Sequence, residues 1–319
     1  MKWEKIGKIF NPLNFKLNNG CQEYAQSPQA LVFDDYVRIY FSSRVKSENG
    51  KWLSHVNFVD MDKSFKKVLR VSEKDVIKLG KLGSFDEHGI FPFSVYRCDG
   101  KIIAYTTGWN RKFSVSIDAG IGYAFSEDNG ETFEKLGEGP ILSASLEEPF
   151  LVGDAFVRKY ENIYYMWYIY GSKWIKDKNE LDPQRVYKIA YATSTDGVKW
   201  SRKRRNIISD KLNKNECQAL PTVIFNNGKY HMIFCYREAI GFRYDKSKGY
   251  RLGYAWSSDL INWKREDERV GLNLSNKGEW DSDMMCYPNI FECEGHIYIL
   301  YNGNEFGRYG FGLAKLIED

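Results

Sequence analysis

Short runs of alternating apolar and polar residues, separated by turns rich in Asp, Asn and Gly, follow one another along the whole chain. Three segments, which begin at Ile121, Ile189 and Leu252, read almost alike: IGYAFSEDNGETFEKL, IAYATSTDGVKWSRK and LGYAWSSDLINWKRE, and a weaker copy begins at Ser54. Each is a strand of period two, a tight turn and a second strand that opens with Trp or Phe, which predicts a β-hairpin. No long stretch has the helical period, so we expect an all-β protein.

A second unit precedes each hairpin and consists of a strand, a polar turn and a more aromatic strand. It occurs five times, beginning at Ser27, Phe91, Asp154, Leu220 and Tyr287. The two units together give four strands per repeat. The aromatic anchors of the hairpins are 63 to 68 residues apart: Phe65, Phe133, Trp200 and Trp263.

The fifth repeat ends at its third strand, and a segment at the other end of the chain resembles the missing fourth strand. Residues 2–5 (KWEK) are similar to residues 199–202 (KWSR) and 262–265 (NWKR). A strand from the N-terminus that completes the last sheet is how a radial array of sheets closes without an open edge. We therefore predict a single domain, 1–319: a five-bladed β-propeller of four-stranded antiparallel blades, closed by the N-terminal strand. A pair of β-sandwiches is the alternative, but it leaves the displaced strand unexplained.

Composition narrows the class of protein. Aromatic residues make up 16% of the chain, which excludes disorder, and no apolar run approaches the roughly 18 residues of a membrane span. The charged N-terminus does not resemble a secretory signal, and the net charge of +4 is too small to indicate nucleic-acid binding. The six cysteines are scattered, so free thiols are a simpler interpretation than a disulfide framework or a zinc site. We expect a cytoplasmic protein that binds neither membrane nor nucleic acid.

Acidic residues recur just before the first strand of the repeats. Five residues before the first-strand proline of four repeats stand Glu23, Glu87, Glu216 and Asp283, whereas the third repeat carries Asp154 directly before Ala155. In a propeller these positions face one another at the mouth of the central channel. Converging carboxylates shift one another's pKa values, so that one can donate a proton while another accepts one. We therefore take Asp154, Glu23, Glu216 and Asp283 as candidate catalytic residues; solvated loop acids are the alternative.

Further polar and aromatic residues fall on the same expected face. We assign substrate-binding roles to Asp86, Glu87, His88 and Asp281, and to residues at the ends of the second strands: Arg44, Trp109, Arg111, Trp174, Arg237 and Asn304. Aromatic faces stack on sugar rings, and arginine forks bind carboxylate or phosphate. Packing between blades and ordinary ion pairs are the alternative roles for these aromatic residues and arginines.

The repeats resemble the five-bladed propellers of glycoside hydrolase families 32, 43, 68 and 130. The resemblance rests on the hairpins of the form GYAxSxDGxxW, the small residues that open the inner strands, and the acids at the channel mouth. It is nearest to uncharacterised bacterial glycosidase-like proteins associated with surface-polysaccharide genes. Asp154 and its strand are similar to the segment that carries an essential Asp in those families, but their Asp-Pro in blade one is here Ser27-Pro28.

The resemblance implies a carbohydrate-active protein with three open functions. An inverting glycoside hydrolase would use Asp154 and Glu23 as acid and base. A glycoside phosphorylase would replace water with inorganic phosphate, held by Arg44, Arg111, Arg237 or His88. A non-catalytic propeller would only bind carbohydrate during polysaccharide assembly. We expect no metal cofactor because there is no His cluster, although a Ca²⁺ among the channel acids stays open.

Overall fold

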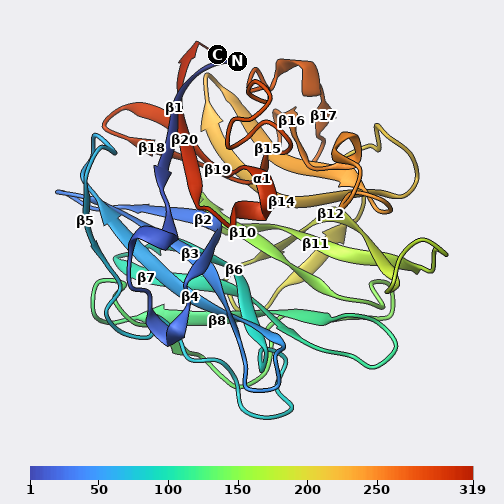
Figure 1. Cartoon of the computed structure of the whole chain (residues 1–319). Helices are drawn as coiled ribbons and strands as arrows, with labels where there is room; N and C mark the ends of the chain where they lie inside the picture. The colour runs from blue at the N-terminus through green and yellow to red at the C-terminus, as the bar shows by residue number, and fades with distance from the viewer. Residues whose placement is uncertain (319) are drawn as a thin grey trace.

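The computed structural model describes residues 1–318, and nearly all regular structure in them is β-strand (Figure 1). This confirms the all-β prediction and its four-stranded antiparallel sheets. The described residues also include four 3₁₀ turns (Pro12–Asn14, Asn18–Gly20, Lys246–Lys248 and Asp267–Arg269) and one short helical turn, α1 (Asn304–Gly307). No helix among them is long and apolar enough to cross a membrane.

The first half of the chain forms two antiparallel sets of four strands. The first set is β2 (Glu23–Val32), β3 (Val37–Lys46), β4 (Trp52–Met61) and β5 (Val68–Val71). The second is β6 (Gly89–Cys98), β7 (Lys101–Asn110), β8 (Asp118–Ser126) and β9 (Glu134–Lys135). A single parallel pair, Ser54 with Gly89, joins the two sets into one continuous sheet.

The rest of the chain forms three separate four-stranded sheets. The first contains β10 (Val152–Tyr160), β11 (Ile163–Ile175), β12 (Gln184–Ser194) and β13 (Ser201–Arg204). The next contains β14 (Glu216–Asn226), β15 (Lys229–Glu238), β16 (Arg251–Ser257) and β17 (Lys264–Arg265). The last contains β18 (Cys286–Cys293), β19 (His296–Asn302), β20 (Phe311–Glu318) and β1 (Lys2–Phe10).

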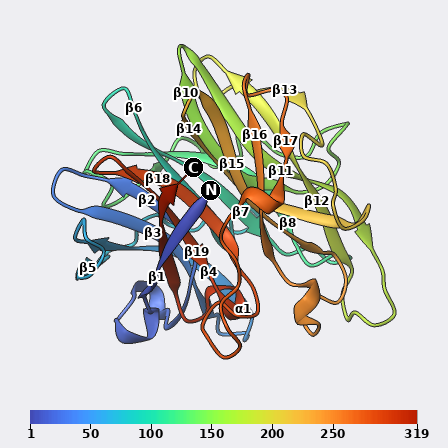
Figure 2. The ribbon, with the colours of Figure 1, turned by 90° about the horizontal axis from the view of Figure 1, so that it is seen from above.

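The N-terminal strand belongs to the last sheet, next to the C-terminal strand. Strand β1 pairs antiparallel with β20, with Trp3 opposite Leu316 and Lys8 opposite Gly312. The two chain ends therefore lie side by side in both views (Figures 1 and 2). The indole Nε1 of Trp3 also donates a hydrogen bond to the carbonyl of Val270 at 2.8 Å, so β1 is also held by the segment that connects β17 to β18.

The first strands of the sheets meet in the interior. Strand β2 contacts β6, β6 contacts β10, β10 contacts β14, β14 contacts β18, and β18 contacts β2. Each of the five breaks its regular pairing at the same place, where a β-bulge shifts the register. Four bulges contain a residue with positive φ: Ser27, Asp154, Leu220 and Tyr287. A bulge re-aims the side chain beside it, and Asp154 and Tyr287 both line the central cavity.

Candidate active site

Two adjoining cavities lie where the first strands meet. The larger, of about 290 Å³, is lined by Asp154, Trp109 and Tyr287 among others, and the smaller, of about 150 Å³, by Tyr24, Arg237 and Phe242 among others. Both are lined by Arg44, Arg185, Tyr187, Arg243, Tyr250 and Tyr287. They therefore form one site with two compartments, large enough together for a sugar ring and a second small group.

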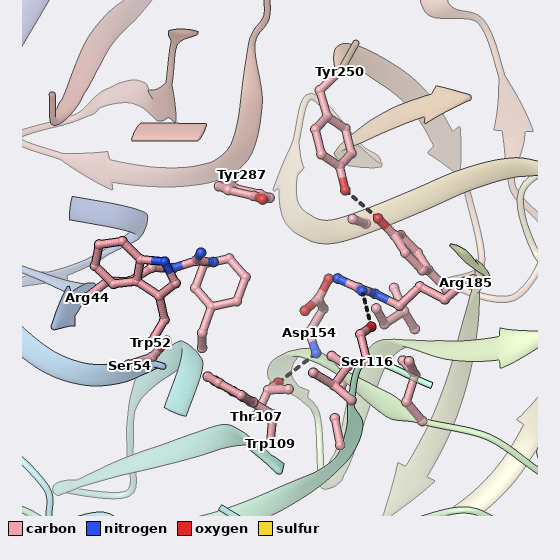
Figure 3. A pocket seen from close by; sticks show the side chains of 18 of the residues that line it. Arg44, Trp52, Ser54, Thr107, Trp109, Ser116, Asp154, Arg185, Tyr250 and Tyr287 are labelled. Carbon is pink, nitrogen blue, oxygen red and sulfur yellow. Dashed lines mark hydrogen bonds between the residues drawn. The ribbon is translucent and has the colours of Figure 1, made fainter. Parts of the chain in front are cut away.

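Asp154 is held at the bulge of β10 by the sheets on either side (Figure 3). Its backbone N–H donates to the hydroxyl of Thr107 on β7 at 2.7 Å, and its carboxylate Oδ2 accepts the backbone N–H of Leu220 on β14 at 3.2 Å. Gly153 permits the close approach, because a Cβ there would lie 2.5 Å from Cγ2 of Thr107. The backbone thus fixes the direction of the carboxylate.

Burial changes the acidity of this carboxyl group. Asp154 is only 8% exposed, and desolvation raises its pKa to about 7, although the hydrogen bond from Leu220 and the charge of Arg185 act to lower it. At neutral pH a large fraction of the molecules therefore carries a protonated Asp154. Such a group can donate a proton to a leaving oxygen, which is the role of a general acid.

Four arginines surround the cavities, and none of them forms an ion pair within the described residues. They are Arg44 at the end of β3, Arg185 at the start of β12, Arg237 at the end of β15 and Arg243 in the following loop. Other arginines of the chain, such as Arg38 and Arg265, are paired with carboxylates. The site therefore holds unneutralised positive charge, which favours an anion.

Aromatic and polar neighbours hold several of these guanidinium groups in place. The ring of Phe242 lies 3.5 Å from Cζ of Arg237 and 4.2 Å from Cζ of Arg243. Arg237 donates to the hydroxyl of Tyr187 at 2.9 Å, and that hydroxyl also contacts the hydroxyl of Tyr250. The cations are thus positioned before any ligand binds, which reduces the entropy lost on binding.

Among the predicted site residues, the structure brings Asp154, Arg44, Trp109 and Arg237 to the cavities. Sequence reasoning missed Arg185, Arg243, Tyr187 and Tyr250. The repeat pattern could have identified the two tyrosines. Tyr187 and Tyr250 each stand four residues before the Tyr of the hairpin motif, which is Tyr191 or Tyr254. Ala119, at the same position before Tyr123, also lines the larger cavity. Aligning the starts of the third strands would have placed these three residues together.

Several of the recurring acidic residues do not line the cavities, where we expected them, but form ion pairs within their own sheets. Four buried carboxylates each pair with a cation on the fourth strand of the same sheet: Asp86 with Lys135 (2.5 Å), Glu148 with Arg202 (2.8 Å), Glu216 with Arg265 (2.6 Å) and Asp281 with Lys5 (2.7 Å). We call these four pairs the blade clasps. The recurrence of acids in the sequence partly reflects the clasps, which tie the start of the first strand, or the segment just before it, to the outermost strand in four of the five strand sets.

Other predicted residues lie outside both cavities. The carboxylate of Glu23 is bonded by Arg308 (Nη2–Oε1 2.7 Å), and that of Asp283 by Lys246 (2.7 Å). Glu87 accepts the N–H of Gly83, and His88 lies 3.9 Å from Glu87. Glu23, Glu216 and Asp283 therefore do not line either cavity with Asp154, and each pairs with a cation instead; their catalytic role stays a prediction.

The remaining three predicted residues support the walls of the site or its loops. The guanidinium of Arg111 lies over Trp109 and bonds the carbonyl of Trp52. Trp174 pairs with Arg185 across β11 and β12. Asn304 accepts the N–H of Asp283 at 2.8 Å. Residues 1–318 contain no group of three His, Cys, Asp or Glu side chains placed to hold a metal ion, and the cofactor prediction stays a prediction.

The fold is shared with β-propeller glycoside hydrolases. A β-1,2-mannobiose phosphorylase from Listeria innocua superposes with a TM-score of 0.69 at 13% identity, over 99% of this chain and 96% of that chain. A thermostable family-43 glycoside hydrolase superposes with a TM-score of 0.65 at 14% identity, over 93% of this chain and 91% of that chain. At these identities the likeness concerns the fold alone.

Sequence relatives cover most of the chain. A 1,2-β-oligomannan phosphorylase from Thermoanaerobacter sp. (strain X514) is 29% identical over 79% of this chain and 78% of its own length. No known protein-family model matches the chain. Two uncharacterized proteins of Mycobacterium tuberculosis, MT1551 and Rv1502, are each 32% identical over 99% of both chains. The chain therefore belongs to the same protein family as Rv1502 and MT1551.

Proposed function

We propose that this protein is a glycoside phosphorylase, which cleaves a glycosidic bond by transferring the glycosyl group to inorganic phosphate. The observation that carries the proposal is the composition of the central site: one carboxylate, Asp154, beside four arginines without carboxylate partners. Phosphorolysis needs one proton donor and a cationic site for phosphate. Hydrolysis by inversion needs a second carboxylate that activates water.

The architecture we propose is a closed five-bladed propeller formed by one domain, 1–319. The cyclic contacts of β2, β6, β10, β14 and β18 and the pairing of β1 with β20 support this arrangement. In such a ring the bulges of the first strands surround the axis. Residues far apart in sequence, such as Arg44 and Arg243, are then brought to a single site.

In the proposed reaction the sugar ring occupies the larger compartment and phosphate the smaller one. Asp154 transfers its proton to the glycosidic oxygen as the bond from that oxygen to the anomeric carbon breaks. A phosphate oxygen forms the new bond to the same carbon, and Asp154, left as a carboxylate, regains a proton from solvent. Arg185, Arg237 and Arg243 neutralise the phosphate and hold it in line for attack.

Hydrolysis is the second candidate, with Asp154 as acid and Glu23 as base. The structure gives it less support, because Glu23 lies outside both cavities and is bonded by Arg308. The sequence likeness to a 1,2-β-oligomannan phosphorylase favours the first candidate. A non-catalytic carbohydrate-binding protein would have no need of the raised pKa of Asp154. The proposed partners are thus a carbohydrate and inorganic phosphate, and the proposed location is the cytoplasm.

Product analysis tests the proposal. The full chain is incubated with a panel of oligosaccharides that includes β-1,2-mannobiose, with and without inorganic phosphate, and sugar 1-phosphate is followed by ³¹P NMR. We expect sugar 1-phosphate only when phosphate is present, and none with Asp154→Asn. The control Asp34→Asn removes an exposed carboxylate and keeps full activity. Equal release of free sugar without phosphate would identify a hydrolase instead.

A further inference from the structure

The central site carries more positive charge than one phosphate ion neutralises. Four arginines face the two cavities, and the only carboxylate that lines either of them in the described residues is Asp154, a large fraction of which is protonated near pH 7. A phosphate group carries about −1.5 to −2 at this pH. Roughly two positive charges therefore remain without a counterion when phosphate is bound. Unpaired charge in a partly buried site is costly, so a second anion is expected there.

Arg44 is the cation with the fewest partners. Its guanidinium lies over the ring of Tyr24, 5.2 Å from the centroid, its Nε is buried without a hydrogen-bond partner, and no carboxylate lies within 4 Å. Burial lowers the pKa of Arg44 below its usual value. The residue paired with it across the ladder is Glu23, but both oxygens of Glu23 are bonded by Arg308, at 2.7 and 3.0 Å. The acid opposite Arg44 in the ladder is thus paired with another cation.

Arg44 lines both compartments, but it is held by other neighbours than the arginines that bind phosphate in the proposed reaction. Arg237 and Arg243 share the ring of Phe242, whereas Arg44 comes from β3 and stacks on Tyr24. In Figure 3 Arg44 and Trp52 lie on one side of the pocket, and Asp154 and Arg185 on the other. Trp52 and Trp109 line the larger compartment together with Arg44, and such rings stack on sugars.

We propose that the glycan substrate itself carries an anionic substituent, a carboxylate or a phosphate group, on the sugar ring bound in the larger compartment, and that Arg44 binds it. This inference rests on the proposed function, because it assigns phosphate to the other three arginines. Arg44 is then a specificity-determining residue. It selects acidic sugars over neutral sugars of the same ring geometry, and it takes no part in proton transfer.

Binding of matched sugar pairs tests the inference without any turnover. Isothermal titration measures the affinity of the full chain, in saturating inorganic phosphate, for glucose, mannose and galactose, for the three corresponding hexuronates, and for the three hexose 6-phosphates. We expect at least one acidic sugar to bind tenfold or more tightly than its neutral parent. The hexuronate and 6-phosphate arms separate the two sources of the charge. In Arg44→Leu the preference falls to less than about twofold, while the affinity for inorganic phosphate changes by less than about threefold.

The control is Arg97→Leu, which removes the same charge at an exposed position and keeps the preference. The inference is overturned if no acidic sugar binds more tightly than its neutral parent, if Arg44→Leu keeps the preference, or if Arg44→Leu abolishes phosphate binding. Its failure is distinct from failure of the proposed function. If the protein phosphorolysed only neutral glycans, the proposed function would hold and this inference would fail. If it bound acidic sugars selectively but catalysed no phosphorolysis, Arg44 would still determine specificity and the proposed function would fail.

Discussion

The carboxylate of Asp154 accepts the backbone N–H of Leu220 at the matching bulge of the next sheet, 3.2 Å away. In three other strand sets, the backbone N–H at the bulge of the first strand donates to a side chain on the second strand of a neighbouring set. Ser27 donates to Asn302, Asp154 to Thr107, and Tyr287 to Cys235. Asp154 is thus both a bulge residue and the partner of the next bulge. The bulge that recurs in the fold therefore also orients the carboxylate of Asp154.

The activity of the protein depends on the protonation of Asp154. Because burial raises its pKa to about 7, the acid form needed for proton donation is lost as the pH rises through about 7. We expect kcat for phosphorolysis to be flat on the acid side and to fall about tenfold per pH unit well above 7. Initial rates between pH 5 and 9 at saturating substrate and phosphate measure this. A profile that is flat up to pH 9 would remove Asp154 as the acid.

The same group makes stability depend on pH. Its folded pKa of about 7 lies above the ordinary value of 3.8, so between these values the folded state binds a proton that the unfolded state has released. The free energy of unfolding therefore falls as the pH rises from about 4 to 7. Asp154→Asn removes this penalty and stabilises the protein at pH 8 by up to about 4 kcal/mol, with little effect near pH 4. Urea denaturation of both proteins at the two pH values tests this, and a pH-independent difference would contradict it.

Thr107 positions Asp154 through the 2.7 Å bond from the aspartate N–H. Thr107→Val keeps the shape of the side chain but removes the acceptor, so the bulge is free to shift. We expect kcat to fall about ten- to a hundredfold, because small misplacements of a catalytic group are costly, with the affinity for phosphate unchanged. Thr107→Ser keeps the hydroxyl and retains most of the activity. Equal losses in both variants would show that packing of the Thr107 methyl group matters instead.

Glu216 belongs to a blade clasp, with its carboxylate fully buried and 2.6 Å from Arg265. Glu216→Ala leaves the guanidinium buried with one partner fewer, and we expect a loss of about 3–5 kcal/mol in the free energy of unfolding. Asp283→Asn breaks a more exposed pair with Lys246 and is expected to cost less than about 1 kcal/mol. Chemical denaturation measures both. If Glu216→Ala lost its activity but kept its stability, Glu216 would be a catalytic residue and the structural role would be contradicted.

Much of the fold could be read from the sequence because each repeat is a local pattern. The period-two strands, the hairpin turns and the likeness of Trp3 to Trp200 are all carried by neighbouring residues, and they predict the sheets and the place of β1. The acids were harder to interpret. Glu216 and Glu23 look alike in sequence, and their difference lies in cations far along the chain, Arg265 and Arg308. Arg185 and Arg243 were missed because a lone arginine near a strand end carries no pattern of its own.

The origin of the oxygen in the released sugar tests the central claim most directly. Cleavage is run in H₂¹⁸O with ordinary phosphate, and the products are analysed by mass spectrometry. The account predicts sugar 1-phosphate without ¹⁸O, formed at a rate that rises with phosphate concentration and vanishes in its absence. Free sugar that carries ¹⁸O at the anomeric carbon, released at the same rate without phosphate, would contradict it.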